Sequence, residues 1–323
     1  MTKKEYISAY RAARLSAGKL TAKTMTELKQ TYIDAGKLAA KAARDAELSG
    51  LGELDINSWR SIERQLAEGA RLINDKLAGV LPKVMGDAAA LASSLDKKWL
   101  LDTVKDAGGV LSKTAIRDVF VGVNTRVIES TVNRMGQAGY TFSERIWKTA
   151  DGYQNDLKSM IRASLAQGRD PVKIAGDIQT FIGDGKIQLM KRYGKLKAGT
   201  AQFVRRIPVN VDYRAMRLVR TELYASLKEA GVEAGKANPG CTQEFDWIME
   251  LGRAHWDCSC PDLAAGGPYT ADNIPVQPHP SCACILQPRL MDRREFVADL
   301  AKWANGEDVP YIDNWKREYY DKV

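Results

Sequence analysis

The chain has 323 residues, of which 45% are hydrophobic and 27% charged, a composition that excludes a disordered or fibrous protein and indicates a globular core. Its 48 Lys and Arg residues against 40 Asp and Glu residues leave a net charge of +8, spread too evenly to form a dedicated nucleic-acid-binding arm. No apolar run reaches the roughly 20 residues of a membrane span, and no signal peptide is evident, so we expect synthesis in the cytoplasm and no membrane contact.

The first 235 residues have the composition and spacing of helices. Ala, Leu, Lys, Arg, Glu and Gln dominate, and apolar residues recur every three or four positions. Breaks are expected at three glycine-containing stretches, near 49–52, at 108–109 and at 136–139. The sequence therefore predicts a mainly α fold with an extended helical body.

Local signals mark three elements within this body. Thr141 and Glu144 have the spacing of a capping box, which predicts a helix start. We interpret residues 157–182 as a helical hairpin used for packing, because it lacks the exposed polar face of a DNA-reading helix-turn-helix. Between 212 and 234 an apolar stripe predicts another helix, on which Arg220 is either a solvated side chain or a bracing contact to the next region.

The composition changes after Gly235. Residues 245–249 predict a short strand, and six prolines between 261 and 288 exclude a long helix there. Such a loop-rich segment of about 50 residues buries too little apolar surface to fold without an internal staple, that is, a crosslink within the segment. We therefore divide the chain into an N-terminal helical region for assembly contacts (1–150), a hairpin with a following Arg-Thr-Glu helix (151–240), a small loop-rich α+β module (241–290) and a helical tail (291–323).

All five cysteines and both histidines lie between residues 241 and 284. A Cys-x-Cys pair followed by a His-x-x-Cys-x-Cys run is typical of two halves of a zinc site. Five is an odd number, and the cytoplasm is reducing, so metal binding is favoured over disulfides. The role of the zinc is expected to be structural, because four protein ligands leave no open position for water. Four of five residues are expected to be the ligands: Cys258, Cys260, His279, Cys282 and Cys284.

The surplus donor is not fixed by the spacing. Either Cys258 or Cys284 could be a buried thiol instead of a ligand. Cys241, further upstream, is interpreted as a small core residue. His255 is either a residue that supports the ligands or a surface residue.

The same region resembles a known family. Between residues 220 and 284 the chain carries, in order, an Arg-Thr-Glu helix, a strand with a Trp, an Asp followed by paired cysteines and a Leu-x-x-Gly turn, and a closing His-Pro-x-Cys-x-Cys. In this order these elements resemble the C-terminal domain of Mu F-like minor head proteins, the phage head morphogenesis family. The first cysteine pair is one residue closer than in the family, and Ala283 replaces the usual Arg. The motif makes Arg220, Glu222 and Asp257 candidates for bracing the module.

The resemblance implies a structural minor head protein of a tailed phage. Such a protein would assemble in the host cytoplasm, be present in the virion at the portal end of the head or the inner capsid, and occur in more than one copy. Its expected partners are the portal protein and the major capsid or scaffold protein, with nonspecific contact to packaged DNA. It would act in head assembly and in packaging or delivery of DNA.

Two other functions compete with this expectation. The first is a zinc-dependent nuclease or hydrolase, with Glu244 or Glu250 as base. The second is a nonspecific DNA-binding zinc protein, for which arginines near the module offer salt-sensitive contacts. The sequence contains no P-loop, and with both histidines in the module it contains no Ser-His-Asp arrangement elsewhere. We therefore expect no enzymatic activity.

Overall fold

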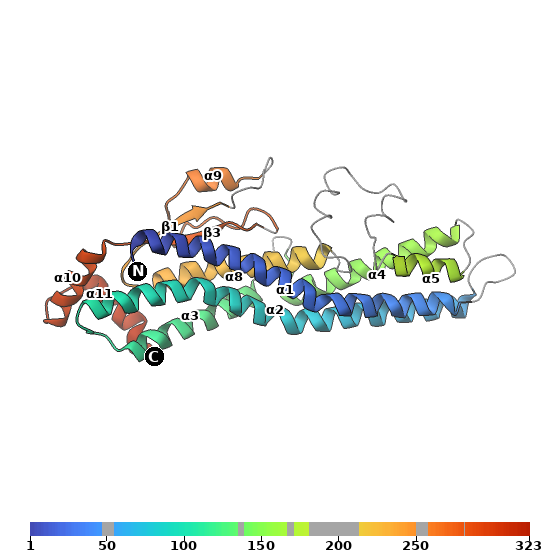
Figure 1. Ribbon diagram of the computed structural model, residues 1–323, viewed down its shortest axis with the longest axis horizontal. Helices are drawn as coiled ribbons and strands as arrows, with labels where there is room; N and C mark the ends of the chain where they lie inside the picture. Colours follow the sequence, from blue (N-terminus) through green and yellow to red (C-terminus); the bar gives the residue numbers. More distant parts are fainter. Residues whose placement is uncertain (47–54, 135–138, 167–170, 181–212, 250–257, 281) are drawn as a thin grey trace. The chain divides into compact units, whose positions relative to one another are not determined.

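The structure is a computed structural model that describes residues 1–46, 55–134, 139–166, 171–180, 213–249, 258–280 and 282–323. Helices dominate these residues, which confirms the mainly α prediction (Figure 1). The elements are α1 (Lys3–Arg44), α2 (Ile56–Asp106), α3 (Lys113–Asn133), α4 (Phe142–Ala166), α5 (Pro171–Thr180), α8 (Tyr213–Lys236), β1 (Cys241–Ile248), α9 (Cys260–Ala265), β2 (Tyr269–Thr270), β3 (Ile285–Leu290), α10 (Arg293–Ala304), α11 (Pro310–Glu318) and the 3-10 turn η2 (Tyr320–Lys322).

The helix ends follow local chemistry that the sequence contains. α2 ends just before Gly108 and Gly109, whose positive φ angles of 86° and 79° are accessible to glycine. The capping box before α4 is formed, because the backbone N–H of Thr141 donates to Glu144 across 2.7 Å and that of Glu144 donates to the Thr141 hydroxyl across 3.3 Å. The break expected at 49–52 and most of the one at 136–139 lie outside the described residues.

The chain divides into two compact units, and each collects segments that are distant in the sequence. Unit 1 contains residues 1–20, 82–134 and 220–323, and unit 2 contains residues 21–81 and 135–219. The four consecutive regions expected from composition differ from this grouping, and their separate roles remain a prediction.

Unit 2 is held together by aromatic and ionic contacts between its helices. The rings of Tyr32 and Tyr153 meet edge to face with centroids 5.0 Å apart, and the Tyr153 hydroxyl donates to the Tyr32 carbonyl across 3.2 Å. Arg214 of α8 pairs with Asp156 of α4 at 2.8 Å. α4 and α5 also contact each other, as expected for a hairpin over 157–182.

Asp96 places a fully buried carboxylate in the core of unit 1. Asp96 of α2 accepts hydrogen bonds from the hydroxyls of Tyr6 (2.7 Å) and Tyr10 (2.6 Å) on α1 and from the Asn238 amide (3.1 Å). The thiol of Cys241 lies 3.7 Å from the same side chain. Four donors from two segments, α1 and residues 238–241, thus offset part of the cost of removing Asp96 from water, which ties α1, α2 and the start of β1 together.

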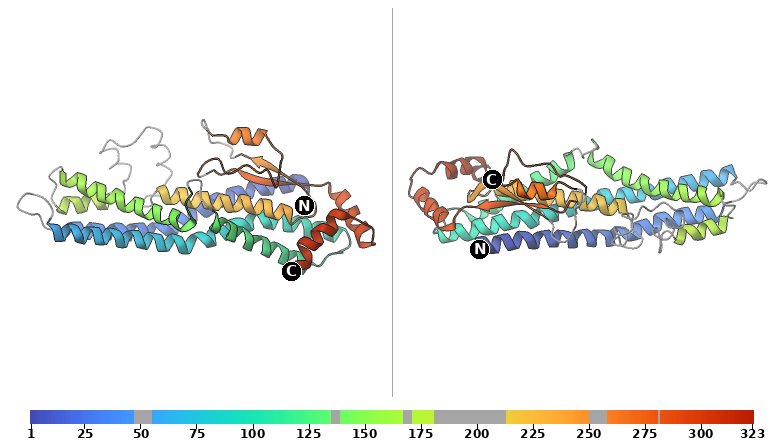
Figure 2. Two further views of the ribbon diagram at one scale, coloured as in Figure 1. Left: turned by 180° about the vertical axis from the view of Figure 1, so that it is seen from behind. Right: turned by 90° about the horizontal axis from the view of Figure 1, so that it is seen from above.

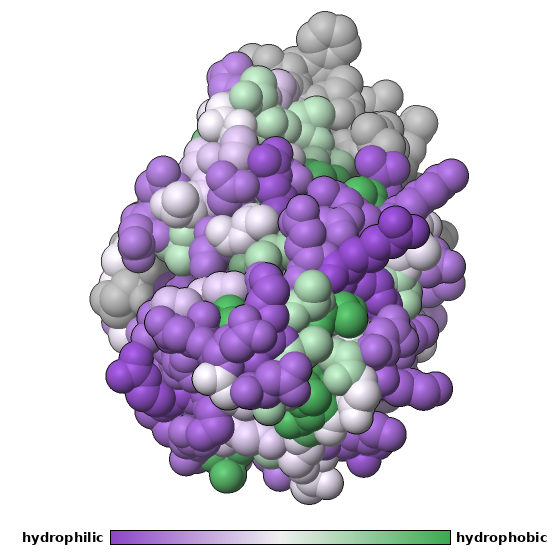
Figure 3. Space-filling view, turned by 90° about the vertical axis from the view of Figure 1, so that its left-hand side faces the viewer, coloured by the Kyte–Doolittle hydropathy of each residue, from purple (hydrophilic) through white to green (hydrophobic). Residues whose placement is uncertain are grey.

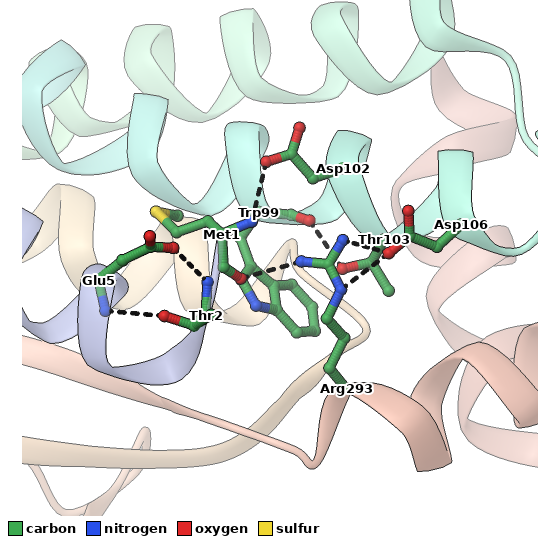
Figure 4. Close-up of polar contacts among 8 residues, drawn as sticks. All are labelled: Met1, Thr2, Glu5, Trp99, Asp102, Thr103, Asp106 and Arg293. Carbon is green, nitrogen blue, oxygen red and sulfur yellow. Dashed lines mark hydrogen bonds and ion pairs between the residues drawn. The ribbon is translucent and has the colours of Figure 1, made fainter.

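The start of α1 is tied to α2 and α10 by a second set of polar contacts (Figure 4). The α-ammonium of Met1 lies 3.1 Å from the carboxylate of Asp102 on α2. The guanidinium of Arg293 donates to the Met1 carbonyl across 2.9 Å and to the Asp106 carboxylate. Below these contacts the Trp99 ring stacks on Phe296 of α10, with centroids 5.7 Å apart.

A three-stranded antiparallel sheet with the order β2-β1-β3 lies on one side of the helices of unit 1 (Figure 1). β1 begins at Cys241, so it is longer than the strand predicted at 245–249, and β3 was not anticipated because it contains Pro288. Pro288 is tolerated because β3 is an edge strand of this sheet. Both views in Figure 2 place the sheet beside α8, and a Cβ on Gly231 would lie only 2.6 Å from the Leu286 carbonyl oxygen.

The surface of unit 1 is mostly polar where α10 and α11 lie. Hydrophilic side chains cover most of the face in Figure 3, and apolar ones form small separate patches. No helix among the described residues contains an apolar stretch long enough to cross a bilayer.

Candidate metal centre

Two short segments of unit 1 bring the cysteines and a histidine together. Cys258 and Cys260 flank the N-cap of α9, where Pro261 occupies the first turn, a position at which its missing N–H costs nothing. His279, Cys282 and Cys284 lie between β2 and β3, and Cys284 directly precedes β3. Because β2 and β3 both pair with β1, the sheet holds the two segments near each other.

The donor atoms form two groups of three that share Cys260. In the first group, the donors of Cys258, Cys260 and His279 lie within 4.8 Å of one another, and in the second group those of Cys260, Cys282 and Cys284 do so. Cys260 Sγ lies 3.5 Å from His279 Nε2 and 3.8 Å from Cys282 Sγ. The five residues expected as ligands therefore form a cluster that could hold a metal ion.

The hydrogen bond between His279 and Pro280 determines which nitrogen of the imidazole carries the proton. Its Nδ1 lies 2.9 Å from the backbone carbonyl of Pro280, and since a carbonyl only accepts, Nδ1 carries the proton. In the neutral imidazole Nε2 is then unprotonated, and Nε2 is the atom that faces Cys260. A hydrogen bond from the second ring nitrogen to a carbonyl is the usual support of a metal-binding histidine.

The turn that carries His279 is itself fixed. The carbonyl of His279 accepts from the Gln277 amide across 3.1 Å and from the backbone N–H of Cys282 across 3.4 Å. These contacts set the spacing between the imidazole and the Cys282 thiol. The distances between the donors are therefore built by the fold rather than left to a bound ion to impose.

The thiols differ in acidity because of what surrounds them. The hydrogen bond from Cys284 lowers the pKa of Cys282 to about 5 against the opposing effect of burial, and the charge of Lys228 lowers it further. Burial, together with repulsion from Cys282, raises the pKa of Cys260 to about 12. One thiolate is thus stabilised at this site, and a cation is needed to stabilise a second one beside it.

An apolar cluster lies under the cysteines. It contains three of the five cysteines together with the following buried residues: Val232, Phe245, Trp247 and Leu286. The residues Cys260, Cys282 and Cys284 are at most 1% exposed, whereas Cys258 and His279 are half-buried. The donors thus span the boundary between this core and the surface.

The residues proposed to brace the module lie in different surroundings. Glu222 is buried and pairs with Arg134, at the end of α3, across 2.9 Å. The Arg220 guanidinium lies 5.1 Å from the ring centroid of Tyr224, one turn along the same helix. Asp257 and His255 lie outside the described residues. Cys241 is buried next to Asp96 and belongs to neither group of donors.

Lys228 and Asp96 are buried charged residues that were not predicted from the sequence. Lys228, on α8, and Asp96, on α2, both occupy positions that interrupt an apolar pattern. The available signal was their spacing, because Lys228 lies four residues from buried Tyr224 and Val232, and Asp96 lies four residues from buried Ala92 and Leu100. A charged residue on the buried face of a helix is rare unless it has a partner.

Comparison of the chain with known protein families, with curated proteins and with solved structures finds no match.

Proposed function

We propose that the cysteine and histidine cluster binds one structural zinc ion. Two sulfurs that each lie about 2.3 Å from a tetrahedral zinc are about 3.8 Å apart, and a sulfur and an imidazole nitrogen are about 3.5 Å apart. The two distances from Cys260, 3.8 Å to Cys282 and 3.5 Å to His279, agree with these values. This agreement is the observation that carries the proposal.

Burial favours a structural over a catalytic ion. A catalytic zinc needs an open coordination position that water and substrate can reach. Three of the sulfurs lie in a close-packed apolar cluster, and the cluster offers more than four protein donors for a tetrahedral ion. The nuclease or hydrolase alternative therefore has less support than a staple that closes the module.

The module needs such a staple. Within the part of it that the structure describes, regular elements are short: β1 has eight residues, α9 has six, β2 has two and β3 has six. Elements of this size supply few hydrogen bonds and little buried area, so crosslinks usually stabilise segments of this kind. A zinc ion held by residues from both sides of β2 would provide one, since metal-binding free energy adds directly to folding.

At the level of the whole chain, we propose a structural minor head protein of a tailed phage. The support is the order of the Arg-Thr-Glu helix, the paired cysteines and the closing His-Pro-Ser-Cys-Ala-Cys, which resembles Mu F-like proteins. In this proposal the helices contact the portal and the capsid or scaffold protein, the metal-stapled module keeps one of those contact surfaces ordered, and the net charge of +8 permits weak contact with packaged DNA.

Particles produced by cells that carry the gene test the assignment. Mass spectrometry of gradient-purified heads should detect the chain in DNA-filled particles, in far fewer copies than the major capsid protein. A Cys282→Ser variant should lower its incorporation, because the module would lose its staple. Absence of the chain from purified particles would reject the virion role and leave the metal-site proposal standing.

A further inference from the structure

Lys228 is buried without an oxygen partner. Its side chain projects from α8, only 6% of the residue is exposed, and its Nζ has no hydrogen-bond partner among the described residues. Burying an unpaired ammonium is costly, so such a residue is expected where a negative charge compensates it. The surroundings of Lys228 show what that charge is.

The carboxylates near Lys228 are engaged elsewhere. Glu229, its neighbour on α8, accepts from the Ser130 hydroxyl across 3.3 Å, and Glu233 pairs with Lys236 across 2.9 Å. The Lys228 ammonium lies 5.3 Å from the ring centroid of Trp247, whose π face offers only part of the compensation.

Lys228 faces the cysteines of the cluster, because the Trp247 ring that it contacts packs against them. Burial lowers the pKa of Lys228, and the neighbouring cysteines, Cys282 first among them, oppose that shift. The three buried cysteines of the cluster pack against Trp247 and Leu286 in the apolar cluster beside α8. The ammonium is thus placed beside the sulfurs and away from bulk water.

We infer that Lys228 is the counter-ion of the metal centre, held outside the ligand set, where its ammonium offsets the negative charge that thiolate ligands leave around the ion. This inference rests on the proposed zinc site. A divalent ion with three thiolates and one neutral imidazole carries a net charge of minus one, and one buried lysine balances it.

The charge of Lys228 also bears on whether the cysteines bind a metal ion or form a disulfide. A disulfide between Cys260 and Cys282 would remove the negative charge from both sulfurs, and Lys228 would lose compensation from two of the three cysteines that act on it. A buried ammonium without compensation is strongly unfavourable. Lys228 therefore favours the reduced, metal-binding state of the cluster.

The test is the zinc affinity of the full chain, measured by competition with a fluorescent chelator. Lys228→Met keeps most of the side-chain volume and removes the charge, and we expect it to weaken zinc binding by about 10- to 100-fold, the range for partners that support metal ligands. Lys228→Arg keeps the charge and should bind zinc more tightly than Lys228→Met. Lys236→Met is the matched control, because Lys236 lies on the same helix and pairs with Glu233.

Cobalt substitution checks that the ligands are unchanged. The thiolate-to-cobalt charge-transfer band should have the same intensity in the wild-type chain and in Lys228→Met, because neither loses a cysteine. If Lys228→Met does not fold, Lys228→Gln gives the same comparison with a polar, uncharged side chain. Equal zinc affinity in the wild-type chain and the uncharged variant would overturn the inference, whereas a wild-type chain that binds no zinc would overturn the metal site itself.

Discussion

The hydroxyl of Tyr10 donates a 2.6 Å hydrogen bond to the buried carboxylate of Asp96. Both residues are nearly inaccessible to solvent, so water cannot replace the hydroxyl if it is removed. The contact joins α1 to α2 in the same core that receives the start of β1.

Tyr10→Phe should lower the free energy of unfolding by about 1.5 to 3 kcal/mol, the range for a hydrogen bond to a charged group. Urea denaturation of the full chain at pH 7 measures this loss of stability. Tyr311→Phe is the control, because the Tyr311 hydroxyl also donates to a carboxylate, that of Asp299, but at a half-exposed position where water can take its place. Equal losses in the two variants would show that the burial of Asp96 has no energetic role.

Asp96 should also make stability depend on pH. Burial raises the pKa of its carboxyl, although hydrogen bonds from Tyr10, Tyr6 and Asn238 oppose the rise. The folded chain therefore binds this proton more tightly than the unfolded chain. The contribution of Asp96 is full below its unfolded pKa of about 3.9 and is lost as the pH rises through the raised folded pKa.

Asp96→Asn removes this titration and keeps the shape of the side chain. The free energy of unfolding of the wild-type chain should therefore fall relative to that of Asp96→Asn as the pH rises from about 4. Urea titrations of both proteins at several pH values provide the comparison. A difference that stays constant with pH, or that changes in the opposite direction, would show that the folded pKa of Asp96 is not raised.

Reasoning from sequence succeeded where the signal is local. The capping box at Thr141, the helix end at Gly108 and the apolar stripe of α8 each depend on residues within a few positions of one another. The donor cluster was also predictable, because cysteine and histidine are confined to one segment and serve few other purposes there.

What the sequence could not predict depends on partners far along the chain. Asp96 meets Tyr6 and Tyr10 across about 90 positions, and Lys228 meets the cysteines of another segment, so neither contact leaves a local pattern. The edge strand β3 was missed because Pro288 argues against a strand unless its edge position is known.

The close contact between α8 and β3 provides a test of how the module is docked. A methyl group on Gly231 would lie 2.6 Å from the Leu286 carbonyl oxygen, which cannot move without displacing β3. We expect Gly231→Ala to cost about 1 to 3 kcal/mol through overpacking and to speed proteolysis of residues 258–290. Gly79→Ala on α2 has open space around the new methyl group and should leave that digestion unchanged. Similar digestion of the two variants would contradict this docking.

The fourth ligand can be identified by comparing two cysteines. Zinc sites commonly take two donors from each of two segments, which favours Cys258 with Cys260 and His279 with Cys282. Cys284 is buried and hydrogen-bonds to Cys282, as a thiol outside the ligand set would. We expect Cys258→Ser to weaken zinc binding strongly and Cys284→Ala to retain one zinc per chain with lower stability. The reverse result would assign Cys284 as the ligand.

The most direct test of the metal centre is the metal content of the full chain purified under reducing conditions without chelators. Elemental analysis together with a protein assay should find one zinc ion per wild-type chain and far less in Cys260→Ser, since Cys260 belongs to both groups of donors. A folded wild-type chain without zinc, which also fails to take up added zinc, would contradict the account.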